Sequence, residues 1–307
     1  MKAALCTRYG PPEVLQLRDV PKPVPRKRDV LIRIHAAAVT VSDVYIRSGV
    51  PTAQLWFRVL SRLAVGLRRP RRSIIGMVMA GEIEAIGSGV TRFRVGDRVY
   101  GSTIMRMGCY AEYTRIPAKG GVLAPAPRNL THEEAAAIPY GGLIAWHFLS
   151  KADIRPGQHV LVYGASGAIG TAAVQIAKHF GAQVTGVCSG VNTELVRSLG
   201  ADAVLDYTKE DTPPPGARYD LVFDAVGRRK TSALKVACIA AVAPERYLSV
   251  DKGMPVFRRK NLLRLTELVE AGVVRPVIDK RYPLEEIAEA QRYVELRHKK
   301  GNVVIAM

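Results

Sequence analysis

Residues 160–182 read VLVYGASGAIGTAAVQIAKHFGA and join an apolar strand, a glycine-rich turn and an alanine-rich helix. Three glycines fall where a dinucleotide-binding fold admits no side chain: the first permits the tight turn, the second lets the backbone approach a pyrophosphate, and the third allows close helix-on-strand packing. The strand QVTGVCS follows directly, so the glycines belong to a strand–turn–helix–strand unit. We interpret the stretch as a phosphate cradle built from backbone N–H groups at the helix start. The predicted cradle residues are Gly164, Ala165, Ser166, Gly167, Ala168, Ile169 and Gly170.

The end of the next strand indicates which nicotinamide nucleotide the cradle takes. An NAD site usually offers a carboxylate to the ribose 2′-hydroxyl about 20 residues after the first glycine. Here the chain reads CSGVN, and no acidic residue comes before Glu194. Ser189 and Asn192 can donate hydrogen bonds to a 2′-phosphate, which a carboxylate would repel. The sequence therefore predicts NADPH as the cofactor.

The order of elements predicts two domains of an α/β protein. The chain has 307 residues, 48% hydrophobic and 23% charged, as expected of a globular protein with more than one core. As far as about Pro117, short β-rich runs are separated by Gly, Pro and Asp, which predicts an antiparallel β domain. From His159 onward, apolar strands alternate with helices, which is typical of a parallel sheet covered on both faces.

The N-terminal sequence MKAALCTRYG lacks the apolar segment of a signal peptide. The chain also contains no run of about 18 apolar residues that would predict a membrane-spanning helix. We therefore expect a cytoplasmic protein.

Positive charge is the unusual feature of the composition. The 45 Lys and Arg residues outnumber the 27 Asp and Glu residues, and the formal charge of +18 attracts anionic cofactors and polyanions. The densest basic stretch is FRVLSRLAVGLRRPRRS, residues 57–73. It fits either a basic amphipathic helix for a membrane surface or nucleic acid, or a solvated helix face followed by a loop. The second interpretation is favoured, and we predict no specific nucleic-acid or membrane partner.

Cysteine and histidine spacing gives no local metal motif. The four cysteines are widely scattered, and the six histidines show no HExxH pattern. We expect such isolated histidines to be surface residues or satisfied core residues, and we expect no bound metal. The residues are Cys6, Cys109, Cys188, Cys238, His35, His132, His147, His159, His179 and His298.

Eight segments together are far more specific than the glycine turn alone. In chain order they are YGPPEVLQL, AAAVTVSDVYIRSG, GEIEAIGSGVTRFRVGDRVYG, AAAIPYGGLIAW, GASGAIGTAAVQIAK, LGADAVLDY, FDAVG and KKGNVVI. In these segments the chain resembles the medium-chain dehydrogenase/reductase superfamily, in particular its zinc-independent quinone oxidoreductase branch. The resemblance implies a GroES-like catalytic domain over 1–120, a Rossmann NADP-binding domain with a doubly wound parallel sheet over 121–262, and a return to the catalytic domain over 263–307. It also implies a homodimer.

The resemblance implies roles for particular residues. Tyr45 matches a family tyrosine that hydrogen-bonds a quinone or enone oxygen, and Thr40 replaces an asparagine of the same signature, so both are predicted catalytic residues. Tyr207 and Arg297 match residues used near the 2′-phosphate. The remaining cofactor-binding residues implied in this way are Val226, Ser249 and Asn302.

Other departures from the family concern zinc and the sixth strand of the Rossmann sheet. Zinc members carry a cysteine after the AAAV strand and a Gly-His-Glu motif further on, whereas this chain has Thr40-Val41-Ser42 and Gly76-Met77-Val78 there. The resemblance therefore argues against zinc alcohol dehydrogenase chemistry. The region between VDKGMPVF and LVEAG is shorter than in family members, which puts in question the sixth Rossmann strand and dimer pairing through it. MPVF is short and broken by Pro255, so we do not expect it to replace that strand.

The leading hypothesis is an NADPH-dependent reductase that transfers a hydride to a quinone or to an α,β-unsaturated carbonyl without a metal. Catalysis would come from holding the nicotinamide near an electron-poor carbon, while Tyr45 and Thr40 stabilise charge on oxygen. One alternative is an NADP-dependent alcohol or aldehyde reductase. The other is a redox-inactive nucleotide-binding protein whose basic surface binds nucleic acid, a membrane or a protein partner.

Overall fold

The structure is a computed structural model that describes residues 1–49, 65–67, 69–119, 121–227 and 231–307. The chain divides into two compact units. Unit 1 consists of Met1–Pro139 and Ile278–Met307, and unit 2 of Tyr140–Val277. The sequence placed the corresponding boundaries after residues 120 and 262, so each divide lies further along the chain in the structure.

The predictions for the basic stretch and for a membrane-spanning helix depend on which residues are described. Residues 57–64 and 68 of the basic stretch lie outside them, so its interpretation stays a prediction. Within the described ranges, no helix has both the length and the apolarity needed to cross a bilayer.

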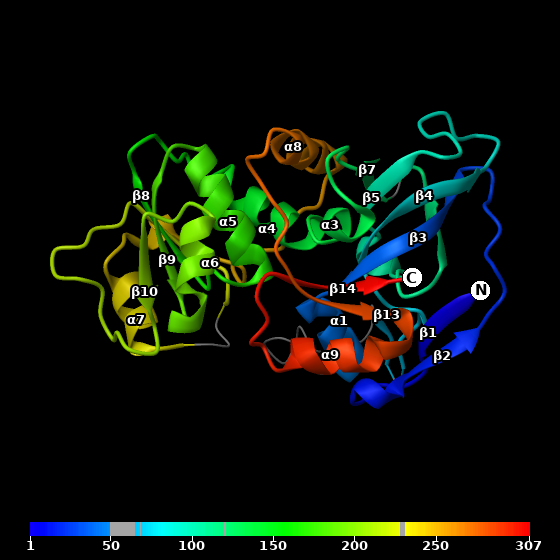
Figure 1. Cartoon of the computed structure of the whole chain (residues 1–307), viewed down its shortest axis with the longest axis horizontal. Helices are drawn as coiled ribbons and strands as arrows, with labels where there is room; N and C mark the ends of the chain where they lie inside the picture. Colours follow the sequence, from blue (N-terminus) through cyan, green and yellow to red (C-terminus); the bar gives the residue numbers. More distant parts are fainter. Residues whose placement is uncertain (50–64, 68, 120, 228–230) are drawn as a thin grey trace. The chain divides into compact units, whose positions relative to one another are not determined.

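Unit 1 is a β domain, as the short β-rich runs predicted. In its described part, a seven-stranded sheet has the order β13-β14-β3-β4-β5-β7, with β6 also paired to β3, and β1 pairs separately with β2. The long strand β3 is central because it pairs with β14, β4 and β6, all antiparallel. Figure 1 shows β3 between β14 and β4. The strands are β1 (Lys2–Cys6), β2 (Leu15–Asp19), β3 (Asp29–Val39), β4 (Val78–Ile86), β5 (Arg98–Ser102), β6 (Tyr113–Pro117), β7 (Val122–Pro125), β13 (Ile278–Pro283) and β14 (Asn302–Ala306).

Helices α1, α3 and α9 pack on the strands of unit 1. Helix α9 contacts α1 and the strands β3, β13 and β14, while α3 contacts β3 and β4. A single apolar core joins side chains from these elements, including Ile32 of β3, Met79 of β4 and Ile305 of β14. The helices and short 3-10 turns are η1 (Pro12–Val14), α1 (Val41–Ser48), η2 (Ile104–Arg106), α3 (His132–Ala136), η5 (Leu284–Glu286) and α9 (Ile287–Glu295).

Unit 2 contains the predicted parallel sheet, with the order β10-β9-β8-β11-β12 and every pairing parallel. Its core includes Leu161, Val187 and Val222, which come from three adjacent strands. The chain moves outward from β8 to β10 and then resumes on the other side of β8 with β11. Ligands of such doubly wound sheets bind beyond the carboxyl ends of the strands at this reversal, next to β8.

The elements of unit 2 follow the predicted alternation. They are α4 (Pro139–Leu149, whose first residue belongs to unit 1), β8 (His159–Tyr163), α5 (Ala168–His179), β9 (Gln183–Cys188), η3 (Gly190–Asn192), α6 (Thr193–Ser198), β10 (Ala203–Asp206), β11 (Leu221–Asp224), α7 (Ala233–Ala240), η4 (Pro244–Arg246), β12 (Tyr247–Ser249) and α8 (Arg259–Glu270). In the described part of unit 2, β12 is the last strand of the sheet. Residues 250–258, which include MPVF, form neither strand nor helix, as its length and Pro255 predicted.

Candidate active site

The glycine-rich turn joins β8 to α5 at the point where the sheet reverses. Backbone N–H groups of Gly164 and Ala165 both donate to the Val187 carbonyl of β9, at 3.0 and 2.9 Å, which fixes the turn against the next strand. Gly167 is the N-cap of α5 and has no side chain to cap the helix. The first-turn N–H groups of an α-helix have no partner inside the helix. They therefore point outward as donors, with the positive end of the helix dipole behind them.

The three glycines of the turn differ in their φ angles and in the space that a Cβ would have. Gly164 has a left-handed φ of 81°, and a Cβ there would lie 2.3 Å from a methyl group of Val226. A Cβ on Gly170 would lie 2.0 Å from the Gly164 carbonyl oxygen, so α5 could not pack against the turn. Gly167 has an ordinary φ of −82°, and its nearest neighbour would be 3.6 Å away. The described residues therefore require glycine at the first and third positions but leave room for a Cβ at the second, at van der Waals distance from the Gly164 carbonyl oxygen.

The structure brings three of the predicted cofactor residues into one hydrogen-bonded group. The Asn192 amide nitrogen donates to the hydroxyl oxygens of Ser166 at 3.3 Å and Ser189 at 3.1 Å. The Asn192 side-chain oxygen is buried and has no hydrogen-bond partner among the described residues. Tyr207 is the first residue after β10, and its N–H donates to the Cys188 carbonyl at the end of β9. These residues therefore lie near the carboxyl ends of β8, β9 and β10. We call this edge of the sheet, which carries the cradle, the rim.

Asp206 is a residue of this rim that the sequence reasoning missed. It ends β10 rather than β9, so the search for an acidic residue after β9 passed over it. One carboxylate oxygen accepts hydrogen bonds from the N–H and the hydroxyl of Thr208, and these bonds lower the pKa of Asp206. A Cβ on Gly190 would lie 2.4 Å from the other oxygen, so the Asp206 carboxylate would have to move to admit any other residue there.

The turn after β11 is held by a buried ion pair. The Asp224 carboxylate accepts hydrogen bonds from the N–H groups of Val226 and Gly227, both at 3.0 Å. The Lys235 ammonium lies 2.7 Å from Asp224 and donates to the Gly227 carbonyl, and both side chains are at least 94% buried. Ser249, predicted to bind cofactor, is 3% exposed and donates to Asp224 at 3.4 Å. In the structure, Ser249 therefore supports the turn that carries Val226.

The other predicted residues belong to unit 1. Thr40 is the N-cap of α1: its hydroxyl donates to the Asp43 carboxylate at 2.7 Å, and its oxygen accepts from the Asp43 N–H. The only proton of this hydroxyl is thus committed to Asp43, and Thr40 is 3% exposed. Asn302 is 6% exposed at the start of β14.

Tyr45 and Arg297 lie together in unit 1. The Arg297 guanidinium donates to the Tyr45 hydroxyl at 3.1 Å. Arg297 has a left-handed φ of 61° at the end of α9, a conformation that favours glycine and costs other residues on the order of 1–2 kcal/mol. Arg47, two residues after Tyr45 on α1, is fully buried. It pairs with Glu295 of α9 at 2.8 Å and donates to Gln291 at 3.0 Å. Helix α9 therefore fixes α1 and positions Tyr45.

Asp43 is a buried carboxyl group that the sequence reasoning did not single out. It is fully buried, and desolvation raises its pKa to about 6, although the hydrogen bonds from Thr40 act in the opposite direction. The Tyr110 hydroxyl lies beside it. The sequence signal was available, because Thr40 and Asp43 have the spacing of a capping box, in which an acidic residue three positions after the cap bonds back to it.

We expect Asp43→Asn to change how stability depends on pH. The native carboxyl group has a pKa of about 6, against an ordinary value of 3.8, so the native state binds more protons than the unfolded state between these values. The free energy of unfolding therefore falls as pH rises through this window and stays lowered above it. The variant lacks this loss and should gain up to about 3 kcal/mol at pH 7.5 relative to its difference at pH 4. Urea unfolding at both pH values, with exposed Asp19→Asn as control, measures it; parallel pH profiles would contradict it.

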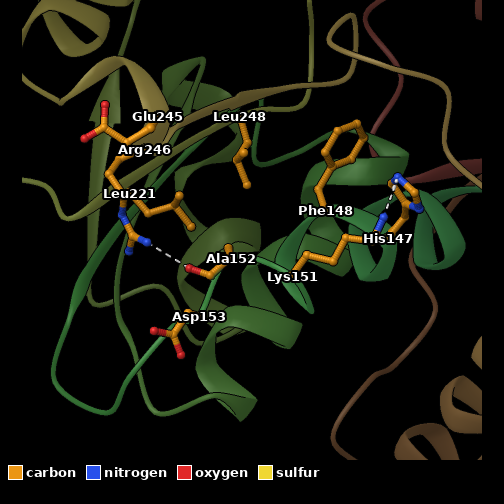
Figure 2. Close-up of a pocket in the computed structure, with 9 residues that line it drawn as sticks. All are labelled: His147, Phe148, Lys151, Ala152, Asp153, Leu221, Glu245, Arg246 and Leu248. Carbon is orange, nitrogen blue, oxygen red and sulfur yellow. Dashed lines mark hydrogen bonds between the residues drawn. The ribbon is translucent and has the colours of Figure 1, made fainter.

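Unit 2 also contains a hollow that is separate from the predicted residues. It has a volume of about 360 Å³ and lies between the end of α4 and the strands β11 and β12. Figure 2 shows Arg246 reaching the Ala152 carbonyl, at 2.9 Å, on one side. On the other side, His147 and Lys151 are 3.3 Å apart. No predicted cofactor residue is among those that line it.

Comparison with known proteins places the chain in a family. Residues 26–128 match the alcohol dehydrogenase GroES-like domain, and residues 199–305 match the family described as zinc-binding dehydrogenase. The chain is 32% identical over 326 residues to the NADPH-dependent alkenal/one oxidoreductase, chloroplastic, of Arabidopsis thaliana, covering 99% of this chain and 79% of that relative. The chain belongs to the quinone oxidoreductase-like branch of the medium-chain dehydrogenase/reductase superfamily. This assignment confirms the resemblance read from the eight sequence segments.

Solved structures agree with the assignment of this quinone oxidoreductase-like chain. It is similar to the quinone oxidoreductase from Coxiella burnetii, with a TM-score of 0.85, 27% identity, and coverage of 100% of this chain and 99% of that one. It is also similar to a mycobacterial protein complexed with NADPH, with a TM-score of 0.80, 26% identity and full coverage of both chains. The GroES-like and Rossmann-like domains predicted from the sequence are thereby confirmed, and the family makes the chain an oxidoreductase.

Proposed function

We propose that the chain is an NADPH-dependent reductase that transfers a hydride to a quinone or to an α,β-unsaturated carbonyl, without a metal in that step. The observation that carries the proposal is Gly167. In the part of the chain that the structure describes, no atom would lie within 3.4 Å of a Cβ at this position, and its φ is ordinary. A ligand that approaches the backbone closely at the start of α5 supplies the missing reason, and a pyrophosphate is the ligand that this position of the motif admits.

The chain offers donors for each part of the nucleotide. The first-turn N–H groups of α5 would hold the pyrophosphate, and Ser166, Ser189, Asn192 and Tyr207 would hold the adenosine ribose and its 2′-phosphate. The Asn192 amide fits this role because its two partners are serine hydroxyls, which both donate and accept. Turning the amide keeps both contacts and presents a donor to a phosphate in place of the unpartnered oxygen. Val226 would cover the turn beside Gly164.

The reduced nicotinamide supplies a hydride when bound. Tyr45 would then stabilise the negative charge that develops on the substrate oxygen. Arg297 donates to the Tyr45 oxygen, and the guanidinium charge favours a negative oxygen nearby. Thr40 has committed its proton to Asp43, so we assign it the positioning of α1 rather than a contact with substrate. Quinones and enones suit this site because both are electron-poor at carbon and carry an acceptor oxygen.

The test is NADPH consumption, followed by absorbance, with a panel of quinones, enals and saturated aldehydes, repeated with NADH. We expect turnover with quinones or enals and a preference for NADPH. Turnover confined to saturated aldehydes would instead support the alcohol or aldehyde reductase. Tight NADPH binding without turnover on any acceptor would reject the proposal in favour of a redox-inactive nucleotide-binding protein.

We expect Tyr45→Phe to lower kcat about ten- to a hundredfold, because one hydrogen bond to the developing oxyanion is lost. The Kd for NADPH, measured by fluorescence titration, should change less than about twofold, since Tyr45 belongs to unit 1 and the cradle to unit 2. Tyr282→Phe, on strand β13 of unit 1, is the matched control and should keep full activity. An unchanged kcat in the Tyr45 variant would remove this hydroxyl from the mechanism.

We expect Asn192→Asp to reverse the nucleotide preference. A carboxylate between Ser166 and Ser189 repels a 2′-phosphate but accepts a hydrogen bond from a ribose hydroxyl. The ratio of kcat/KM for NADPH to that for NADH should fall at least about tenfold, which corresponds to about 1.4 kcal/mol. Asn261→Asp, the same change on α8 of the same unit, should leave the ratio unaltered. An unchanged ratio in both variants would place the 2′-phosphate away from Asn192.

A further inference from the structure

Three elements of unit 1 bring two histidines and a glutamate together. His35 lies on β3 where the register with β4 shifts between Ile34 and Ala36, so it is the extra residue of a bulge. Glu82 lies on β4 beside this bulge, and His132 is the first residue of α3, which packs on both strands. Bulges turn a side chain away from the regular alternation of a strand. No spacing along the chain indicated that His35 and His132 lie together, because they are 97 positions apart.

The distances in the cluster fit a shared ion better than direct hydrogen bonds. Nε2 of His35 lies 3.7 Å from one Glu82 carboxylate oxygen, and Nε2 of His132 lies 3.5 Å from the other. Hydrogen bonds from nitrogen to oxygen are usually about 2.9 Å long. Ligand atoms bound tetrahedrally at about 2.0–2.1 Å from one metal ion lie about 3.3 Å from each other. One ligand atom from each residue can be chosen so that all three lie within 4.8 Å of one another.

Two ring nitrogens of the cluster lack a hydrogen-bond partner. The rings stack with centroids 4.4 Å apart, and Nε2 of His35 and Nδ1 of His132 are buried without a hydrogen-bond partner in the described structure. A neutral imidazole offers a lone pair to a metal ion, and the Glu82 carboxylate supplies negative charge. The charge of the nearby Arg98 opposes a bound cation, so we expect moderate rather than extreme affinity.

We propose that His35, Glu82 and His132 bind one divalent transition-metal ion, with Zn²⁺ as the matching probe, and that the ion ties α3 to strands β3 and β4. Two imidazoles and one carboxylate suit Zn²⁺, whereas Mg²⁺ and Ca²⁺ prefer oxygen ligands. The site uses none of the positions 40–42 and 76–78 at which zinc members of the family differ from this chain. It is independent of the proposed hydride transfer, because none of its residues is assigned to that step.

The test is titration of the chelator-treated full chain with Zn²⁺ by calorimetry at pH 7.5. We expect one equivalent to bind with a Kd on the order of 10 µM or tighter. Saturating Zn²⁺ should raise the Tm by a few degrees, because the ion binds the folded chain and not the unfolded one. Mg²⁺ at the same concentration should not. Absence of saturable Zn²⁺ binding tighter than about 100 µM would overturn the proposal.

Variants locate the ion. Glu82→Gln and His132→Gln should each weaken Zn²⁺ binding at least about thirtyfold and abolish the Tm rise, since each removes one of three ligands. Glu84→Gln, two residues along β4 and paired with Lys22, and His159→Gln in unit 2 should bind as the unaltered chain does. Equal affinity in Glu82→Gln and Glu84→Gln would overturn the site. If His132→Gln fails to fold by circular dichroism, Glu82→Gln decides the matter, because its amide has the same shape and the side chain is 43% exposed.

Discussion

Gly167→Ala is expected to fold and to bind NADPH at least about a hundredfold more weakly, a loss of about 3 kcal/mol. The new methyl group meets no atom of the described residues closer than 3.6 Å, so it enters the space that we assign to the pyrophosphate. Alanine is a poorer N-cap than glycine, so unfolding should become easier by no more than about 1 kcal/mol. Fluorescence titration with NADPH and thermal unfolding measure the two effects on one sample.

Gly170→Ala is the matched comparison, three residues away in the same turn. Its methyl group would lie 2.0 Å from the Gly164 carbonyl oxygen and 2.7 Å from the Ala165 Cα, so backbone must move. We expect it to lower the Tm far more than Gly167→Ala and to lose NADPH binding because the turn is deformed. If Gly167→Ala bound NADPH with unaltered affinity, the cradle and the proposed cofactor site would both be rejected.

Lys235→Met should lower the free energy of unfolding by about 3 kcal/mol or more, because it leaves the 1%-exposed Asp224 carboxylate without its cation. The same ammonium group holds the Gly227 carbonyl, so the turn that carries Val226 also loses an anchor. Urea unfolding provides the measurement. Lys178→Met breaks the exposed pair with Asp202 and should cost no more than about 1 kcal/mol.

A double variant separates charge from packing in this prediction. Asp224→Asn combined with Lys235→Met removes both charges, so it should recover part of the lost stability. Equal losses for Lys235→Met and Lys178→Met would mean that the Asp224–Lys235 pair contributes no more than a surface pair.

The sequence was sufficient for the features that depend on local pattern. The alternation of apolar strands with helical segments predicted the parallel sheet, and the spacing of the glycines predicted the turn between β8 and α5. Both patterns can be read from residues that are close together in the chain. The pairing of Tyr45 with Arg297 was not predicted, since it joins positions 252 residues apart and depends on how α9 packs on α1. The buried pair of Asp224 and Lys235 was also missed, because a lysine in a helix ordinarily faces water and only tertiary packing reveals its burial.

The histidine cluster also could not be predicted from local sequence. No spacing rule relates His35, Glu82 and His132, because they come from two strands and a helix start. Their proximity is set by the β3–β4 register and by the bulge at His35, and a shift of one residue would turn Glu82 to the opposite face.

The position of β14 has a consequence for synthesis of the chain on the ribosome. This strand, Asn302–Ala306, lies inside the sheet of unit 1, between β13 and β3, although it follows the whole of unit 2 in the chain. Unit 2 ends at Val277 and can fold while the chain is still growing, whereas β3 must wait for a partner that is translated after unit 2. While unit 2 is being translated, the nascent protein therefore carries an apolar strand edge that lacks β14, and that interval is when it most needs protection by a chaperone.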